Sequence, residues 1–201
     1  MRRLIALALV AILWPVAASG RQDRPSPVIV VLETGKGAIE IEVDVARAPV
    51  TADNFLRYVD GGFYDGGRFH RTVRPDTETD TANPIQVIQA SRARGSGRQG
   101  FPPIPLERTS TTGLRHVDGA VSMARVAGRP DSAGSDFFIC IGDQPALDFG
   151  GARNADGQGF AVFGRVVKGM DVVRAIQAAP VRPGTQTLAE PVAIARAARK
   201  R

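Results

Sequence analysis

The sequence is poor in the residues that build disulfides, metal sites and nucleophilic catalysts. It has one cysteine, Cys140, and two histidines, His70 and His116, among its 201 residues. A single cysteine excludes an internal disulfide, and one cysteine with two histidines cannot complete a zinc site without carboxylate ligands. The neighbours of Cys140 are apolar, which predicts a buried, inert thiol and argues against a cysteine hydrolase. We therefore expect no metal, no cofactor and no thiol chemistry.

Long apolar runs are also scarce, apart from one near the N-terminus. Leu4–Trp14 is apolar, follows the basic Met1–Arg3, and precedes small residues around Ala18. This order predicts a secretory signal peptide over residues 1–19, because an apolar run of 11 residues is too short to span a bilayer. Residues 20–27 then form a short linker. We expect an exported protein, periplasmic or secreted, without stable membrane insertion.

Dense basic clusters are rare although the formal net charge is +6. Lysine and arginine are scattered along the chain, and only residues 196–201 hold a dense group. Because the sequence has no nucleic-acid-binding motif, this distribution predicts a solvated basic surface and no nucleic-acid partner. We also expect a monomer.

Turn-forming residues are plentiful, with 22 glycines and 14 prolines, and this favours a β-rich fold over a helix bundle. Apolar or alternating segments between the turns predict strands at residues 28–32, 38–44, 85–89, 119–124, 136–142, 159–167 and 191–195. Apolar spacing predicts helices at residues 52–60 and 170–178, with Thr51 as the N-cap of the first. Residues 197–201 are assigned to a basic tail.

The segment Phe69–Arg71 places an aromatic ring, an imidazole and a guanidinium in succession. In a regular strand alternate side chains share a face, so Phe69 and Arg71 are expected to project together, with His70 on the other side or at a rim. An arginine fixed beside aromatic surface can direct hydrogen bonds at a polar group in an apolar pocket. Taken alone, the segment is more typical of a solvated arginine at a strand end.

Four groups of residues, in this order, resemble the cyclophilin family of peptidyl-prolyl cis-trans isomerases. They are Gly66–Arg71, Val87–Gln89, Ser122–Ala124 with Gly134–Ile139, and Leu147–Asp148 with Phe160–Met170. The resemblance extends from about Val28 to Ala195, and we place the isomerase domain at residues 28–196. It implies a mainly β fold, a closed eight-stranded antiparallel β-barrel capped by two α-helices.

The resemblance also implies roles for individual residues. Arg71 is the expected catalytic residue, which donates a hydrogen bond to the proline nitrogen of the twisted substrate. The expected substrate-binding residues are Phe69, Val87, Phe138 and Leu147 around the proline, Gln89, Ala124 and Arg125 along the main chain, and His70, Asp136 and Phe160. We expect Asp136 to pair with Arg71 or Arg125. His116 matches no residue of the family and is expected at the surface.

The predicted function is accelerated rotation of X-Pro bonds during the folding of exported proteins, with proline-containing polypeptides as partners. Val87 replaces a usual methionine and Ala146 a usual aromatic residue, so we expect modest activity and weak binding of cyclosporin-type ligands. The alternative is a non-catalytic or weakly active proline-peptide-binding module or chaperone on the same barrel. The long loop at residues 72–84 has no role that the sequence indicates.

Overall fold

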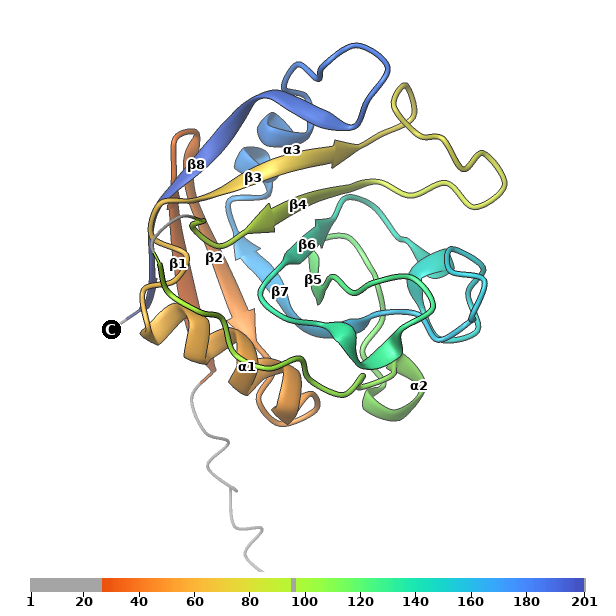
Figure 1. The fold of residues 1–201 in the computed structure, drawn as a ribbon, viewed down its shortest axis with the longest axis horizontal. Helices are drawn as coiled ribbons and strands as arrows, with labels where there is room; N and C mark the ends of the chain where they lie inside the picture. The colour runs from red at the N-terminus through yellow and green to blue at the C-terminus, as the bar shows by residue number, and fades with distance from the viewer. Residues whose placement is uncertain (1–26, 95–96, 201) are drawn as a thin grey trace, which may run out of the picture.

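Eight strands close into a barrel in the computed structural model, which describes residues 27–94 and 97–200 (Figure 1). The strands are β1 Val28–Thr34, β2 Gly37–Val43, β3 Gly67–Val73, β4 Val87–Ser91, β5 Ala120–Met123, β6 Phe137–Cys140, β7 Ala161–Lys168 and β8 Thr187–Arg199. Their order around the barrel is β1-β2-β7-β5-β6-β4-β3-β8, and all neighbouring pairs are antiparallel. The predicted barrel is confirmed. The predicted signal peptide lies outside the described residues.

Alternation along the strands determines which side chains fill the barrel. In β2, Ile39, Ile41 and Val43 are buried, whereas Glu40 and Glu42 between them are partly exposed. This is the period of two that a half-buried strand requires. The aromatic interior is centred on Phe55, whose ring centroid lies 5.5 Å from that of Phe137 and 4.8 Å from that of Phe163.

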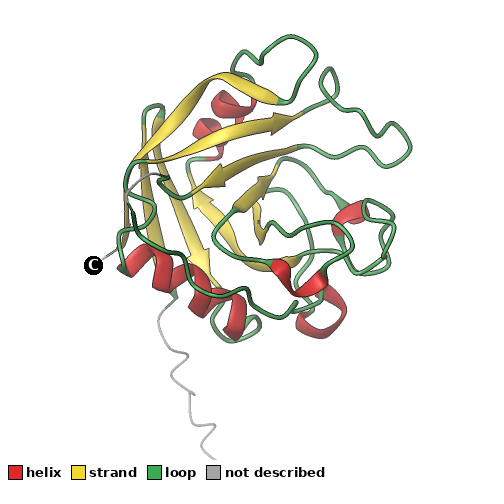
Figure 2. Cartoon of the chain, in the orientation of Figure 1, coloured by secondary structure: helices red, strands yellow, loops and turns green. Residues whose placement is uncertain are grey.

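Two helices cover the barrel on opposite sides, as expected: α1 Pro49–Asp60 and α3 Met170–Gln177 (Figure 1). A four-residue helix, α2 Thr109–Thr112, was not predicted, and two 3-10 turns, η1 Pro130–Ser132 and η2 Pro145–Leu147, lie in the long connections (Figure 2). Within the described ranges, none of the helices combines the length and the apolar character that a membrane span needs.

The expected N-cap of α1 was wrong, because the helix begins at Pro49, three residues earlier than predicted, and its N-cap residue is Ala48. Proline is well tolerated there, since a first-turn N–H has no partner inside the helix. The free N–H groups are instead satisfied by a distant side chain: Glu107 accepts from the backbone nitrogens of Val50 at 3.1 Å and Thr51 at 2.7 Å. The Thr51 hydroxyl also donates to Glu107, at 2.6 Å.

The last strand is longer than expected, and this also corrects the basic tail. β8 runs over Thr187–Arg199 instead of residues 191–195, so residues 197–199 belong to the barrel. The C-terminal half of β8 pairs with β1, with Arg199 opposite Val30, and its N-terminal half pairs with β3. Arg199 also forms an ion pair with Asp60 of α1, at 2.6 Å. A basic sequence at a chain end is compatible with a strand because its charged side chains point outward.

Candidate active site

A cavity of about 190 Å³ opens on the outer face of the barrel, where β3, β4 and β6 lie side by side. Its walls combine aromatic and aliphatic side chains with three arginines. The lining residues are Arg71, Ile85, Val87, Gln89, Ala124, Arg125, Phe138, Leu147, Arg153, Asn154 and Phe160. Eight residues predicted from the sequence therefore meet at one cavity, although 89 positions of chain separate Arg71 from Phe160. Phe69, His70 and Asp136 are not among the residues that line it.

The prediction that Phe69 and Arg71 share a face was wrong, because β3 contains an irregularity between them. Against β4, Phe69 and Arg71 pair with the adjacent residues Ala90 and Gln89, so His70 is an extra residue in β3. The register against β8 also shifts between Phe69 and Arg71. Such a bulge breaks the alternation of side chains. Phe69 is fully buried and its ring lies 6.1 Å from that of Phe137, inside the barrel. Arg71 lines the outer cavity instead.

Two neutral amides hold the guanidinium of Arg71. Nε and Nη2 donate to the side-chain oxygen of Gln186 at 3.0 and 2.6 Å, and Nη1 donates to that of Gln89 at 2.9 Å. Burial lowers the pKa of Arg71 from its usual value, and Arg153 acts in the same direction while Glu78 opposes it. An arginine stays protonated under such a shift. Among the described residues no carboxylate forms an ion pair with Arg71, so its charge remains available at the cavity.

The other two arginines of the cavity are neutralised by ion pairs. Arg125 donates to both carboxylate oxygens of Asp156 at 2.8 Å, and its side chain is only 1% exposed. Arg153 contacts Glu78 at 2.9 Å, and the Glu78 side chain is only 3% exposed. Hydrogen bonds from Arg125 hold the pKa of Asp156 at about 2. This pair therefore persists well into the acidic range.

The expected pairing of Asp136 with Arg71 or Arg125 was wrong, because both arginines already have other partners. The carboxylate of Asp136 lies 3.9 Å from Arg94, an exposed residue, and accepts from the hydroxyl of Ser135 at 3.3 Å. His70 is partly buried close to it, and burial lowers the pKa of this histidine below 6.5, with Asp136 opposing. Neither side chain is among the residues that line the cavity.

The floor of the cavity is aromatic. The rings of Phe138 and Phe160 meet edge to face, with centroids 5.3 Å apart, and the Arg125 guanidinium lies 5.1 Å above the Phe160 ring. Phe138 and Leu147 are buried from solvent. A floor of this kind accepts an apolar ring of the size of proline and excludes most water from it.

His116 supports this floor from behind, and the expectation that it lies at the surface was wrong. Its ring is stacked on Phe138 with an interplanar angle of 12°, and the residue is 1% exposed. Nδ1 lies 2.7 Å from Asp148 and Nε2 lies 3.0 Å from the hydroxyl of Ser122. Because a carboxylate only accepts, Nδ1 carries the proton and Ser122 donates to Nε2. Burial lowers the pKa of His116, against the opposing effect of Asp148.

Sequence reasoning missed four residues of the site: Ile85, Arg153, Asn154 and Gln186. Ile85, Arg153 and Asn154 line the cavity, and Gln186 holds Arg71. Arg153, Asn154 and Gln186 lie in connections where no periodic pattern marks them. Ile85 falls within the strand predicted at residues 85–89, but no motif assigned it to the site. One available signal was the length of the loop after β3, because a long polar connection next to a predicted site commonly contributes to that site.

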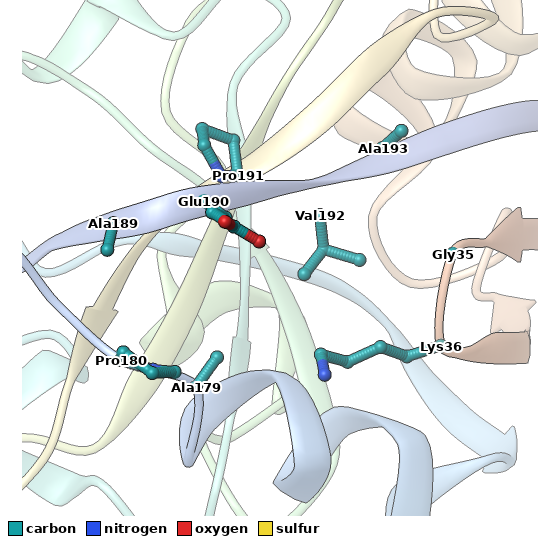
Figure 3. Close-up of a pocket in the computed structure, with 9 residues that line it drawn as sticks. All are labelled: Gly35, Lys36, Ala179, Pro180, Ala189, Glu190, Pro191, Val192 and Ala193. Carbon is teal, nitrogen blue, oxygen red and sulfur yellow. The ribbon is translucent and has the colours of Figure 1, made fainter.

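A larger groove, of about 460 Å³, lies elsewhere, between β8, the end of α3 and the β1–β2 turn (Figure 3). Small residues and prolines form most of its wall, and its charged residues are Lys36 and Glu190 (Figure 3). No aromatic ring or arginine is among these lining residues. The smaller cavity has both an aromatic floor and an unneutralised cation, so we take it as the candidate active site.

The barrel and this cavity define a class of protein: a closed antiparallel barrel with an outward-facing site for an apolar group that carries a hydrogen-bond acceptor. The family model for cyclophilin type peptidyl-prolyl cis-trans isomerase/CLD matches residues 29–199. The chain therefore belongs to the cyclophilin-type peptidyl-prolyl cis-trans isomerase family, and the resemblance noted in the sequence is confirmed. Its activity is the cis-trans isomerisation of peptidyl-prolyl bonds.

Individual relatives agree with the family match. Peptidyl-prolyl cis-trans isomerase A of Dickeya dadantii is 34% identical over 197 residues, which cover 96% of each chain. A peptidyl-prolyl cis-trans isomerase of Acinetobacter baylyi is 37% identical over 152 residues, 76% of this chain and 73% of the relative. A solved cyclophilin of Cryptosporidium parvum shares the fold, with a TM-score of 0.70, 20% identity, and coverage of 87% of this chain and 98% of that one.

Proposed function

We propose that this protein isomerises X-Pro bonds in exported polypeptides, with Arg71 as the catalytic residue and the cavity floored by Phe138 as the proline site. The observation that carries the proposal is the position of an unneutralised guanidinium beside an aromatic floor. The proposal includes action as a monomer.

Rotation about a peptide bond meets a barrier of about 18–20 kcal/mol, because resonance gives the C–N bond double-bond character. When the X-Pro bond is twisted, this resonance is lost and the proline nitrogen becomes a hydrogen-bond acceptor. A donor that bonds this nitrogen stabilises the twisted state and not the planar ones, which is the requirement for catalysis. One charge-assisted hydrogen bond, at about 2–3 kcal/mol, gives roughly thirty- to hundred-fold acceleration.

The remaining residues of the cavity hold the substrate for this rotation. Phe138, Leu147 and Val87 offer an apolar surface to the proline ring, so that the ring is fixed while the preceding residue turns. Gln89 holds Arg71 through its oxygen, and its amide nitrogen donates to no described residue, so it is available for a substrate carbonyl. Low water content at the floor strengthens the hydrogen bond of Arg71 to the proline nitrogen.

Magnetisation exchange between the cis and trans forms of a proline peptide tests the catalytic role directly. The wild-type protein should accelerate exchange, and Arg71→Lys and Arg71→Ala should lower the acceleration about thirty- to hundred-fold. Arg165→Ala is the matched control, since this exposed arginine of β7 does not line the cavity and forms an ion pair with Glu42 of the neighbouring strand β2. Normal peptide binding without accelerated exchange in the wild type would instead identify a non-catalytic binding module.

Export is the second part of the proposal. A basic N-terminus, an apolar run at Leu4–Trp14 and small residues near Ala18 support it. Expression of the full chain in a Gram-negative host, followed by fractionation and mass measurement, should give a periplasmic protein that lacks about the first 18 residues. A full-length protein that stays in the cytoplasm would contradict export and leave the isomerase activity unaffected.

A further inference from the structure

We propose that Gln186 is a positioning residue for Arg71: it fixes the plane of the guanidinium so that the remaining donors face the substrate. This inference rests on the proposed catalytic role of Arg71. Gln186 lies in the connection between α3 and β8, 115 positions after Arg71, and touches it through two hydrogen bonds. It does not line the cavity itself.

The geometry of the contact restricts the guanidinium more than one hydrogen bond could. Nε and Nη2, which form one edge of the planar group, both donate to the same oxygen of Gln186, at 3.0 and 2.6 Å. Nη1 donates to Gln89 from another direction. An arginine has five N–H donors in a rigid fork, so these two amides occupy three and leave two for the substrate. Rotation of the group would break at least one of the three bonds.

Gln186 is itself held on both sides, so its amide cannot turn freely. Its side-chain nitrogen donates to the backbone oxygen of Thr77 at 3.0 Å, which requires the side-chain oxygen to face Arg71. Its backbone oxygen accepts from the nitrogen of Thr72 at 2.9 Å, next to Arg71 in β3. A flipped amide would bring its N–H groups against the guanidinium and its oxygen against a carbonyl.

Thr77 belongs to the long loop between β3 and β4, residues 74–86, which lies beside the connection into β8 (Figure 1). A buried carboxylate orders this loop: Glu78 accepts from the backbone nitrogens of Thr79, Asp80 and Ile85 at 2.8–2.9 Å. Arg153 then bonds Glu78 at 2.9 Å. The loop therefore has a physical task, which is to present the Thr77 carbonyl that orients Gln186.

The choice of an amide has an electrostatic reason. A carboxylate in this position would accept the same hydrogen bonds but would neutralise Arg71, as Asp156 neutralises Arg125. An amide oxygen directs the guanidinium without cancelling its charge. The cation that must stabilise a developing lone pair is thus oriented by neutral groups only.

The test is Gln186→Met, which keeps the length of the side chain and removes both the acceptor and the donor. We expect kcat/KM for a proline peptide to fall about tenfold through kcat. A misaligned donor stabilises the twisted state of the X-Pro bond less well and leaves binding of the planar substrate unchanged. Peptide affinity should change less than about twofold, since the cavity wall is intact. Gln177→Met is the matched control: this α3 glutamine contacts Val73 and Gln86 and not Arg71.

Two further readouts separate positioning from a general structural effect. On an Arg71→Lys background, Gln186→Met should cause no further loss of kcat/KM. In ¹⁵N–¹H spectra of arginine side chains, one Nε–H signal that is absent in Arg71→Lys should shift or broaden in Gln186→Met and stay unchanged in Gln177→Met.

Wild-type kcat/KM in Gln186→Met, or an equal further loss on the Arg71→Lys background, would overturn the positioning role. Neither result would affect the proposed function. An inactive wild type, or an Arg71→Lys variant with full activity, would instead overturn the proposed function itself.

Discussion

Two neighbouring phenylalanines on β6 face opposite sides of the same barrel wall and have different tasks. Phe137 points inward, where its ring meets Phe55 and Phe69 and is fully buried. Phe138 points outward, forms the floor of the cavity with Phe160, and rests on His116. One face therefore holds the barrel together, and the other forms the proposed proline site. The comparison predicts that substitutions on the two faces affect different measurements.

The largest effect is expected on the inner face. Phe137→Ala removes a ring that contacts three other aromatic rings, so it should lower the free energy of unfolding by about 3–5 kcal/mol. Denaturant titration measures this loss, and the fraction that stays folded should isomerise at a rate close to the wild type. A large loss of kcat/KM at a normal unfolding free energy would contradict the division between the faces.

The next effect is expected on the outer face, from Phe138→Leu. Leucine keeps most of the apolar volume, so the free energy of unfolding should fall by less than about 1.5 kcal/mol. The flat floor for the proline ring is lost, however, and kcat/KM should drop about tenfold, mainly through KM. Exchange kinetics over a range of peptide concentrations separate kcat from KM. Unchanged kinetics would remove Phe138 from the site.

His116 lies behind the ring of Phe138 and should make the free energy of unfolding depend on pH. Burial lowers its pKa in the folded state below the 6.5 of the unfolded chain, so the unfolded state binds the proton more readily. This contribution is complete above pH 6.5 and is lost as the pH falls from there through the folded pKa. The free energy of unfolding should therefore decline below pH 6.5, and His116→Gln should flatten that decline.

His70→Gln is the control for this measurement, because His70 is the only other histidine in the sequence and is less buried. Burial lowers its pKa as well, so it should account for a smaller part of the same slope. Equal slopes in the wild type and in His116→Gln would contradict the assignment of a neutral, buried imidazole.

The smallest effect is expected at the rim of the outer face, from Asp156→Asn. Arg125 would lose its carboxylate partner but keep its hydrogen bond to the backbone oxygen of Gly159 at 2.7 Å. We expect kcat/KM to change less than about threefold. Because the pKa of Asp156 is about 2, this ion pair stays charged between pH 4 and 8, and it should cause no change in the kcat/KM of the wild type over that range. A tenfold change in kcat/KM of Asp156→Asn would contradict this expectation and would show that Arg125 contributes more to the activity than we propose.

The sequence predicted the strands well where local pattern decides the structure. Alternation over residues 38–44 identified β2, and the apolar segment around residues 136–142 identified β6. The sequence predicted side-chain positions and partners poorly wherever a contact joins distant parts of the chain. The cap of α1 is Glu107 and not Thr51, and His116 is buried because Asp148 and Ser122 satisfy its ring nitrogens.

The resemblance named the residues around the cavity, but it could not give their partners. Asp136 was expected to pair with an arginine of the site, yet Arg125 binds Asp156, in an irregular loop that has no periodic signal. Arg71 is held by Gln186, which no motif marks. Asp156 lies in the connection before β7, and Gln186 lies in the connection before β8. The path of each connection decides which arginine its side chain reaches, and the pattern of side chains along the sequence does not encode such a path.

The sequence by itself determined most of the strands, the two longer helices and the kinds of side chain available for the chemistry, because period and turn residues act locally along the chain. The closure of the strands into a barrel was implied by the family resemblance and not by these local patterns. Only the tertiary structure decided how these side chains are aimed. A bulge at His70 sends Phe69 inward and Arg71 outward, and a glutamine 115 positions away fixes the guanidinium. Strand register and loop contact set both features, and both arise from interactions between segments that are far apart in sequence.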